Sequence, residues 1–211
     1  MLGRDINLNA VAATSDAAVY LYDTTLNVTW LRDANANGAM DWATANAWAA
    51  NLETGIGAAV ISDWRLPTMA PSPNPIFSFD GSTAMGYNVP ASSSEMASLF
   101  FLTLGNKSYL DTGGAPQVGY GLTNTGSFKN FVAGAQWYGT EYEPDHSFAW
   151  VLYNSWGGQS ANFPVSTLLS AMAVRAGDVA PVPEPETYTM LLAGLLVVGA
   201  VARRRKVSSM L

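Results

Sequence analysis

The sequence predicts an α+β fold: a compact, loop-rich domain of short antiparallel strands and two helices, followed by one C-terminal hydrophobic helix. Three observations predict this class. Short β-prone runs alternate with turn residues, two segments have apolar residues at helical spacing, and an uncharged run of sixteen residues, 187–202, lies near the end. With 211 residues, 49% of them hydrophobic and 12% charged, the chain is long enough to bury a core of its own.

Composition and charge exclude several classes of protein. Residues 1–180 carry 14 acidic and 6 basic side chains, a net charge of −8, and residues 181–211 carry 2 acidic and 4 basic ones, a net charge of +2. An acidic body argues against a nucleic-acid partner, because phosphate binding needs a basic patch. The sequence has no cysteine and one histidine, His146, which excludes disulfides and cysteine nucleophiles and argues against a histidine-based metal or catalytic cluster.

The first predicted elements are a hairpin and a helix. Residues 19–22 and 28–31 are β-prone runs on either side of a polar turn, which is the pattern of a β-hairpin. Asp41 is a typical N-cap for a helix over residues 42–52, whose apolar residues share one face. A glycine at position 55 or 57 is expected to end this helix.

A second helix is predicted from residue 95 to residue 104. Ser92 and Glu95 have the spacing of a capping box, and Gly105 stands where a C-terminal glycine belongs. Residues 67–90 contain five prolines and predict an extended loop. Further short strands are expected at residues 136–138, 148–153 and 170–175.

The loop after the hairpin has the spacing of a calcium ligand set. Oxygen donors occupy positions 1, 3, 5 and 9, with glycine at position 6, as in the first part of an EF-hand loop. Position 12 is Thr44 where an EF-hand has a bidentate glutamate, and Asx turns give the same spacing. A calcium site and a plain loop therefore both stay open. The four donors are Asp33, Asn35, Asn37 and Asp41.

The C-terminal residues carry the strongest functional signal. A helix over residues 187–202 spans about 24 Å, less than the roughly 30 Å hydrocarbon core of a bilayer, and snorkelling basic side chains can make up the difference. A buried core helix is the alternative. The preceding prolines hold the backbone extended and accessible to a processing enzyme. The tripeptide is Pro183, Glu184 and Pro185, and the basic cluster after the apolar run, expected to stay cytoplasmic, is Arg203, Arg204, Arg205 and Lys206.

This order of tripeptide, apolar segment and basic cluster resembles the PEP-CTERM sorting signal. The resemblance covers residues 182–206. It implies insertion into the inner membrane, cleavage by an exosortase-type enzyme, and then a place on the cell surface or in the extracellular matrix of a Gram-negative-type bacterium.

The predicted organisation has five parts. Proteins sorted in this way are expected to begin with a signal peptide, but residues 1–17 have no apolar run of the required length of about 7–15 residues. We expect the true start to lie upstream of Met1, or else the tail itself to direct insertion. The parts are an N-terminal segment, 1–17; the domain, 18–178; the proline-rich linker, 179–186; a transmembrane helix, 187–202; and a basic cytoplasmic tail, 203–211.

The body carries a second signature, Trp-Arg-Leu-Pro-Thr at residues 64–68. With residues 29–31, Glu95 and residues 173–175, it resembles the family named for the C-terminal domain of the Legionella collagen-like adhesin, over residues 19–175. The resemblance implies a fold related to C-type lectins and formylglycine-generating enzymes, and a founding member linked to adhesion and glycosaminoglycan binding. It does not imply oxygenase chemistry, because that chemistry needs a cysteine pair for copper.

Arg65 lies inside this signature and has two interpretations. Trp64 and Leu66 alternate with Arg65, which predicts a short strand with both apolar side chains inward. Arg65 is then expected to pair with an acid or to cap carbonyl groups within the fold. Direct contact with a ligand is the alternative.

Two further groups of side chains are candidates for ligand contact. Glu141, Glu143 and Asp145 alternate along a turn, where they could be a solvated edge, a calcium site or the carboxylate pair of a glycosidase. Among the aromatic residues, Trp150 is expected in the core and Trp156, in a glycine turn, is the best candidate for an exposed ring. The residues predicted as ligand contacts are Trp156, Tyr142 and Arg65.

Together these features predict an exported, non-enzymatic protein that binds extracellular polysaccharide. No cofactor is expected apart from the calcium alternative. Two other functions stay open: a polysaccharide hydrolase that uses the acids near Glu141, and a matrix component without a ligand. The binding hypothesis rests on analogy of fold, and a fold does not fix a function.

Overall fold

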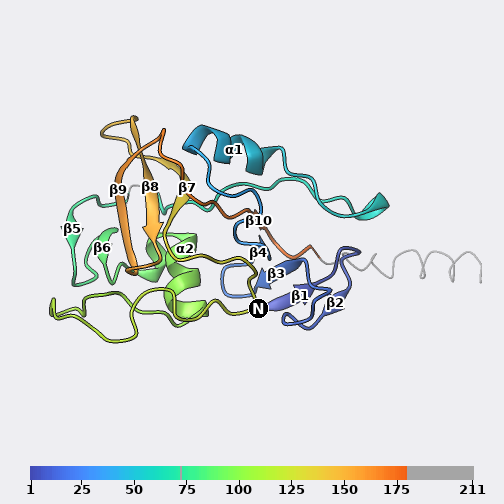
Figure 1. Cartoon of the computed structure of the whole chain (residues 1–211), viewed down its shortest axis with the longest axis horizontal. Coiled ribbons are helices and arrows are strands. Elements are labelled where there is room, and N and C mark those ends of the chain that lie inside the picture. Colours follow the sequence, from blue (N-terminus) through green and yellow to red (C-terminus); the bar gives the residue numbers. More distant parts are fainter. Residues whose placement is uncertain (72, 180–211) are drawn as a thin grey trace, which may run out of the picture. The chain divides into compact units, whose positions relative to one another are not determined.

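Two five-stranded sheets organise the part of the chain that the computed structural model describes, residues 1–71 and 73–179 (Figure 1). Within these residues, no helix has both the length and the apolar character needed to cross a membrane. The predicted linker beyond Val179, the hydrophobic helix at 187–202 and the basic tail at 203–211 lie outside the described residues.

The first sheet has the strand order β10-β4-β3-β1-β2, and all its neighbours are antiparallel. It contains the predicted hairpin, in which Tyr20 pairs with Leu31 and Asp23 pairs with Val28, so that prediction is confirmed. β1 and β2 fall within residues 1–17, which therefore form part of this sheet. The strands are β1 (Leu2–Arg4), β2 (Ala10–Val11), β3 (Tyr20–Asp23), β4 (Val28–Leu31) and β10 (Val174–Ala176).

The second sheet has the order β5-β6-β9-β8-β7. β5 and β6 are parallel, which departs from the predicted antiparallel pattern, and the other neighbours are antiparallel. The expected strands near residues 137 and 150 are confirmed, whereas the one expected at 170–175 is reduced to β10. The strands are β5 (Phe77–Ser78), β6 (Met85–Tyr87), β7 (Ala135–Glu141), β8 (Phe148–Tyr153) and β9 (Gly158–Pro164).

The first helix, α1 (Trp42–Ala50), begins as predicted. Asp41 is its N-cap, and the carboxylate accepts a hydrogen bond of 2.7 Å from the Thr44 backbone N–H. Its end was predicted wrongly, because the helix stops at Asn51, whose backbone N–H donates to carbonyls of the last turn. A 3₁₀ turn, η1 (Gly57–Ala59), lies further on in the region of the glycines that were expected to end it.

The predicted capping box of the second helix is wrong. A 3₁₀ turn, η2 (Ala91–Ser93), contains Ser92, and Ser94 is the N-cap of α2 (Glu95–Ala97), accepting a hydrogen bond from the Ala97 N–H. The helix continues as a π-helix, η3 (Ser98–Thr103), and Gly105 follows it with a φ of +68°, as its predicted capping position requires. The box fails because the Glu95 side chain is bound to an arginine elsewhere in the chain.

The main hydrophobic core lies between the two sheets and α2. It contains side chains of β3 and β4 from the first sheet and of β8 and β9 from the second, together with the buried face of α2 and η3. A second cluster packs α1 against β7 and β8. The largest buried side chains of the main cluster are Trp30, Trp150, Tyr138, Phe100, Leu21, Met96, Leu99, Leu152 and Met172.

Candidate functional site

A pocket of about 350 Å³ opens on the second sheet, where β6, β9 and β8 are neighbours. The register places Tyr87 of β6 and Tyr153 of β8 directly opposite Gly158 of β9. Side chains at facing positions of neighbouring strands project from the same face, so the two phenol rings stand on either side of a residue without a side chain. The pocket is lined by Phe77, Gly86, Tyr87, Tyr153, Trp156, Gly158, Gln159, Ser160 and Asn162.

The hollow between the two rings depends on Gly158. A Cβ atom at this position would lie 3.4 Å from Cδ1 and Cε1 of the Tyr87 ring and 3.0 Å from the Gly86 carbonyl oxygen. An alanine would therefore press on the wall of the pocket and reduce its depth. Glycine in the interior of a strand often marks a place where another group approaches the backbone closely.

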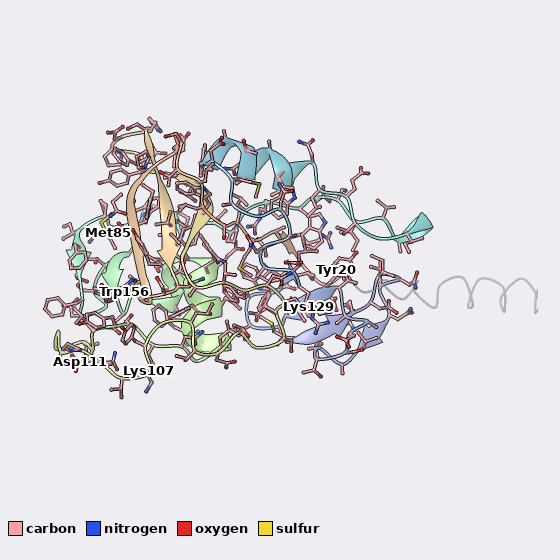
Figure 2. The ribbon with its side chains drawn as sticks, viewed as in Figure 1. Tyr20, Met85, Lys107, Asp111, Lys129 and Trp156 are labelled. Carbon is pink, nitrogen blue, oxygen red and sulfur yellow. The ribbon has the colours of Figure 1, made fainter. Side chains whose placement is uncertain are left out.

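Trp156 borders the same pocket from the turn between β8 and β9. Its side chain is 45% exposed, which confirms the prediction of an exposed ring. It stacks on Tyr120, with ring centroids 5.7 Å apart, and Tyr109 meets it edge-on at 5.1 Å. Figure 2 shows Trp156 at the end of the domain that carries β5 and β6. Two tyrosines thus hold the indole in place while part of it stays open to solvent.

Gln159 also lines the pocket, but its side chain alternates away from Gly158 into the interior, and the residue is 2% exposed. Its Oε1 accepts hydrogen bonds from Ser94 Oγ and Tyr138 Oη, and its Nε2 donates to the Ala84 carbonyl oxygen at 2.8 Å and to Ser93 Oγ at 3.1 Å. Burial raises the pKa of Tyr138 far above its usual value, so this phenol stays a donor. All the hydrogen-bonding capacity of the Gln159 amide is therefore used inside the protein.

The polar groups left for a ligand are neutral. Ser160 is half-buried and Asn162 is exposed, and both line the pocket. Burial raises the pKa of Tyr87 and of Tyr153 above the usual 10, and in Tyr153 a hydrogen bond with the Asn162 side chain opposes the shift. Both phenols are therefore protonated at neutral pH. The site can offer aromatic faces with hydroxyl and amide groups beside them.

Arg65 lies outside this pocket and is bound within the fold. Its Nη1 and Nη2 donate to Glu95 Oε2 and Oε1 at 2.6 and 2.7 Å, and Nη1 also donates to the Leu66 carbonyl oxygen at 3.1 Å. This pair raises the pKa of Arg65 further. Trp64 and Leu66 are each 2% exposed, which confirms the predicted alternation and the predicted acid partner. The alternative role of Arg65, contact with a ligand, stays a prediction.

Tyr142 and the acidic turn also lie outside the pocket. The Tyr142 ring packs edge-on against the buried Trp150, with centroids 6.0 Å apart. Glu141 Oε2 lies 2.8 Å from His146 Nδ1, and Asp145 accepts hydrogen bonds from the Ser147 hydroxyl and N–H, which lower the pKa of that carboxyl. Each of these side chains has a partner inside the fold, and their roles toward a ligand stay predictions.

Three of the predicted calcium donors, Asp33, Asn37 and Asp41, have side-chain hydrogen bonds within the fold, whereas Asn35 Oδ1 is buried with no partner among the described residues. Asp33 accepts hydrogen bonds from the Asn35 N–H at 3.0 Å and from Asn130 Nδ2 at 2.8 Å, while Asp41 caps α1. Asn37 Nδ2 contacts a methionine sulfur. Among residues 1–71 and 73–179, no group of three or more His, Cys, Asp or Glu side chains is placed to hold a metal ion. A calcium site at Asp33, Asn35, Asn37 and Asp41 stays a prediction.

Two walls of the pocket, Phe77 and Tyr87, were not predicted. Trp156 was predicted from its place in a glycine turn, and Tyr153 and Gln159 lie within three residues of it in the sequence. Phe77 and Tyr87 belong to very short strands inside a proline-rich segment, and the pairing of β6 with β9 joins residues far apart in the chain. No local pattern indicates that pairing.

Comparison with known proteins identifies one feature of the chain. A model of the PEP-CTERM protein-sorting motif matches residues 181–206, which confirms the motif predicted there. The motif indicates an exported protein that passes the membrane toward the cell surface and is processed by an exosortase. No curated protein and no solved structure matches the chain. The resemblance of the body to the Legionella adhesin domain and to lectin-like folds therefore stays a prediction.

Proposed function

We propose that this exported protein is a glycan-binding component of the cell surface or extracellular matrix, and that it acts without catalysis. The sorting motif supports export and processing by an exosortase. The pocket between Tyr87 and Tyr153 supports glycan binding by the domain and is the observation that carries the proposal.

The composition of the pocket suits a sugar ring. A pyranose has an apolar face of C–H groups that packs on an aromatic ring, and hydroxyl groups at its rim that need hydrogen-bond partners. Tyr87, Tyr153 and Trp156 supply rings, and Ser160 and Asn162 supply neutral donors and acceptors. Ligand pockets usually measure about 300–1,000 Å³, so this pocket is suited to one or two sugar units of a longer chain.

Binding is favoured over hydrolysis by the side chains at the pocket. Glycoside hydrolysis uses a pair of carboxyl groups about 5–10 Å apart across the bound sugar. Among the described residues, those that line the pocket include no carboxylate, and the acids near Glu141 lie on a separate turn. We therefore propose that a polysaccharide leaves this pocket with its chain length unchanged.

The binding half of the proposal is tested with the full chain in a detergent without a sugar headgroup. Titration calorimetry against soluble neutral polysaccharides should show binding, and Tyr153→Ala should weaken it by about tenfold or more, because one stacked ring contributes roughly 0.5–1.5 kcal/mol beyond the area it buries. Tyr22→Ala, a half-buried tyrosine of β3 in the other sheet, is the matched control and should bind like the parent protein.

Two results would contradict the binding proposal. If the parent protein and the folded Tyr153→Ala variant bind the polysaccharide with equal affinity, the pocket does not take part in binding. Release of reducing ends from the polysaccharide, abolished by Glu141→Gln or Glu143→Gln, would make the protein a hydrolase.

The sorting half is tested in the native host by mass spectrometry of the mature protein. Replacing Pro183, Glu184 and Pro185 with alanine should leave insertion intact and block cleavage, so that full-length protein accumulates in the membrane. Replacing Val207, Ser208 and Ser209 with alanine, just outside the matched residues 181–206, is the control and should leave processing normal. Mature molecules of the parent protein that still end at Leu211 and stay in the membrane would show a plain anchor in place of a sorting signal.

The basic cluster is tested separately. An Arg or Lys costs about 2.5–3.5 kcal/mol at the centre of a membrane helix, so four of them should keep the tail from following the chain across. Replacing residues 203–206 with serine should let uncleaved protein escape from the membrane fraction. Full retention of that variant would show that the cluster does not set the topology.

A further inference from the structure

The charge around the pocket narrows the class of sugar that it can take. This step rests on the proposed glycan-binding function. Among the described residues, all nine that line the pocket are uncharged. Polysaccharides that carry carboxylate or sulfate groups are recognised by Arg and Lys, which supply charge-assisted hydrogen bonds to the anionic oxygens. This pocket has no such donor in its lining.

Most basic side chains of the domain are already occupied elsewhere. Of the six basic residues up to Val179, Arg4 pairs with Asp178 at 2.5 Å, Arg65 pairs with Glu95 at 2.6 Å, and Lys129 lies 3.5 Å from Asp16. Arg32 is buried and donates to three backbone carbonyls. The other two, Lys107 and Arg175, are not among the residues that line the pocket.

The nearest part of the surface is not cationic either. Figure 2 places Lys107 and Asp111 at the same end of the domain as Trp156. Asp80 follows β5, the strand whose Phe77 lines the pocket. Lys107 and Asp111 have opposite charges, Asp80 adds a further acid close to β5 in the sequence, and residues 1–180 as a whole carry a net charge of −8. A polyanion approaching the pocket would meet repulsion.

We infer that the pocket between Tyr87, Gly158 and Tyr153 binds a neutral sugar unit and discriminates against uronate and sulfated units. The two rings and the bare backbone of Gly158 accept the apolar face of the sugar. Ser160 and Asn162 meet its hydroxyl groups, and the acidic domain keeps polyanions away. Asn162, which is exposed and lines the pocket, stands where a basic side chain would reach the anionic group of a uronate.

The test uses matched polysaccharides that differ in one group. Amylose, mannan and galactan are each compared with their C6-oxidised forms, in which the CH₂OH group of the sugar has become a carboxylate. The full chain should bind at least one neutral polymer and should bind its oxidised form at least about tenfold more weakly at low salt. Because the neutral complex has no ion pair, its affinity should change by less than about twofold between 20 and 500 mM NaCl.

A basic side chain introduced at position 162 tests whether the preference for neutral sugars is set at the pocket. Asn162→Lys should strengthen binding of the oxidised polymer by several-fold at low salt, with the gain lost at high salt. Ala47→Lys, on the exposed side of α1, adds the same charge away from the pocket and should bind like the parent protein. Equal gains in both variants would mean that net charge alone sets the preference, which would overturn the role of Asn162.

The outcomes separate this inference from the function on which it rests. Equal or tighter binding of the oxidised polymers, still weakened by Tyr153→Ala, would overturn the preference for neutral sugars and leave glycan binding in place. Failure of the folded protein to bind any of the six polymers would overturn glycan binding itself. If none of the six polymers binds and a proline-rich peptide binds tightly, the aromatic pocket would be assigned to protein recognition.

Discussion

Residues 64–68 and the pocket around Gly158 differ in how visible they are in the sequence and in how exposed they are in the structure. The first is conspicuous as a motif, yet Trp64 and Leu66 are each 2% exposed and Arg65 is held by Glu95. The second has no motif, yet it gathers rings and amides from four neighbouring strands and one turn around an open hollow. A recognisable motif here marks the interior of the fold, whereas the proposed ligand site is assembled by strand pairing.

The two regions should therefore respond differently to substitution. Changes at residues 64–68 should reduce the free energy of unfolding and affect binding only through loss of folded protein. Changes at the pocket should reduce binding and lower the free energy of unfolding by about 1 kcal/mol or less.

The largest effect is expected for Trp64→Ala. Trp64 is buried and stacks on Tyr20, with ring centroids 5.9 Å apart, so removal of the indole should cost about 3–5 kcal/mol of the free energy of unfolding. Urea denaturation followed by circular dichroism measures this loss. Trp156→Ala removes the same side chain from a position that is 45% exposed and should cost about 1 kcal/mol. Losses of equal size at the two tryptophans would remove the distinction between the regions.

A smaller effect is expected for Glu95→Gln. The substitution weakens two hydrogen bonds from Arg65 and one of 2.9 Å from the Thr68 N–H. Since the Arg65 side chain is 39% exposed, water replaces part of the interaction, and the expected loss is about 1–2 kcal/mol. A double-mutant cycle with Arg65→Met measures the coupling between the two side chains. A coupling energy near zero would show that Glu95 acts through its other contacts alone.

Asn162→Ala should separate binding from stability most cleanly. Asn162 is exposed on β9, so its loss should change the free energy of unfolding by less than about 0.5 kcal/mol. Loss of its hydrogen bonds to a sugar should weaken binding by about two- to tenfold. Calorimetry and urea denaturation of the same preparation give both quantities. A stability loss as large as that of Glu95→Gln would place Asn162 among the structural residues.

The smallest expected effect is a fall in the melting temperature at acidic pH. Hydrogen bonds from the Thr44 backbone N–H and the Ser147 hydroxyl hold the pKa of Asp41 and of Asp145 below the usual 3.8. Their contribution to stability is therefore fully present above pH 3.8 and is lost as pH falls through the lower values of the folded protein. The melting temperature should stay constant between pH 7 and 5 and fall below pH 4. Asp41→Asn, which can still cap α1, should reduce that fall, and an unchanged fall would contradict the assignment.

Local interactions explain which elements could be predicted. The hairpin of β3 and β4 follows from two β-prone runs around a polar turn, and the start of α1 follows from one N-cap residue, so neighbouring residues decide both. The alternation of Trp64 and Leu66 is readable from three consecutive residues, although the Arg65 backbone between them pairs with Val174. The exposure of Trp156 follows from its place in a glycine turn.

Long-range interactions explain the rest. Ser92 and Ser94 are both good N-cap residues, and the choice between them depends on the side chain of Glu95, which is bound to a residue 30 positions away. The pocket depends on the pairing of Tyr87 with Gly158, which joins two segments with no common pattern. Hydrophobic periodicity predicts which face of a strand is buried, but it does not predict which strands become neighbours.

The alternation along β9 has a consequence for how such a protein can diversify. Gln159 and Ala161 point into the interior, where the Gln159 amide is fully hydrogen-bonded, while Ser160 and Asn162 line the pocket. Positions 160 and 162, which alternate with the buried Gln159 and Ala161, can therefore be varied with little effect on the interior side chains. In the proposed glycan site, specificity for a new sugar can be selected from a small library at these two positions with little change in the free energy of unfolding.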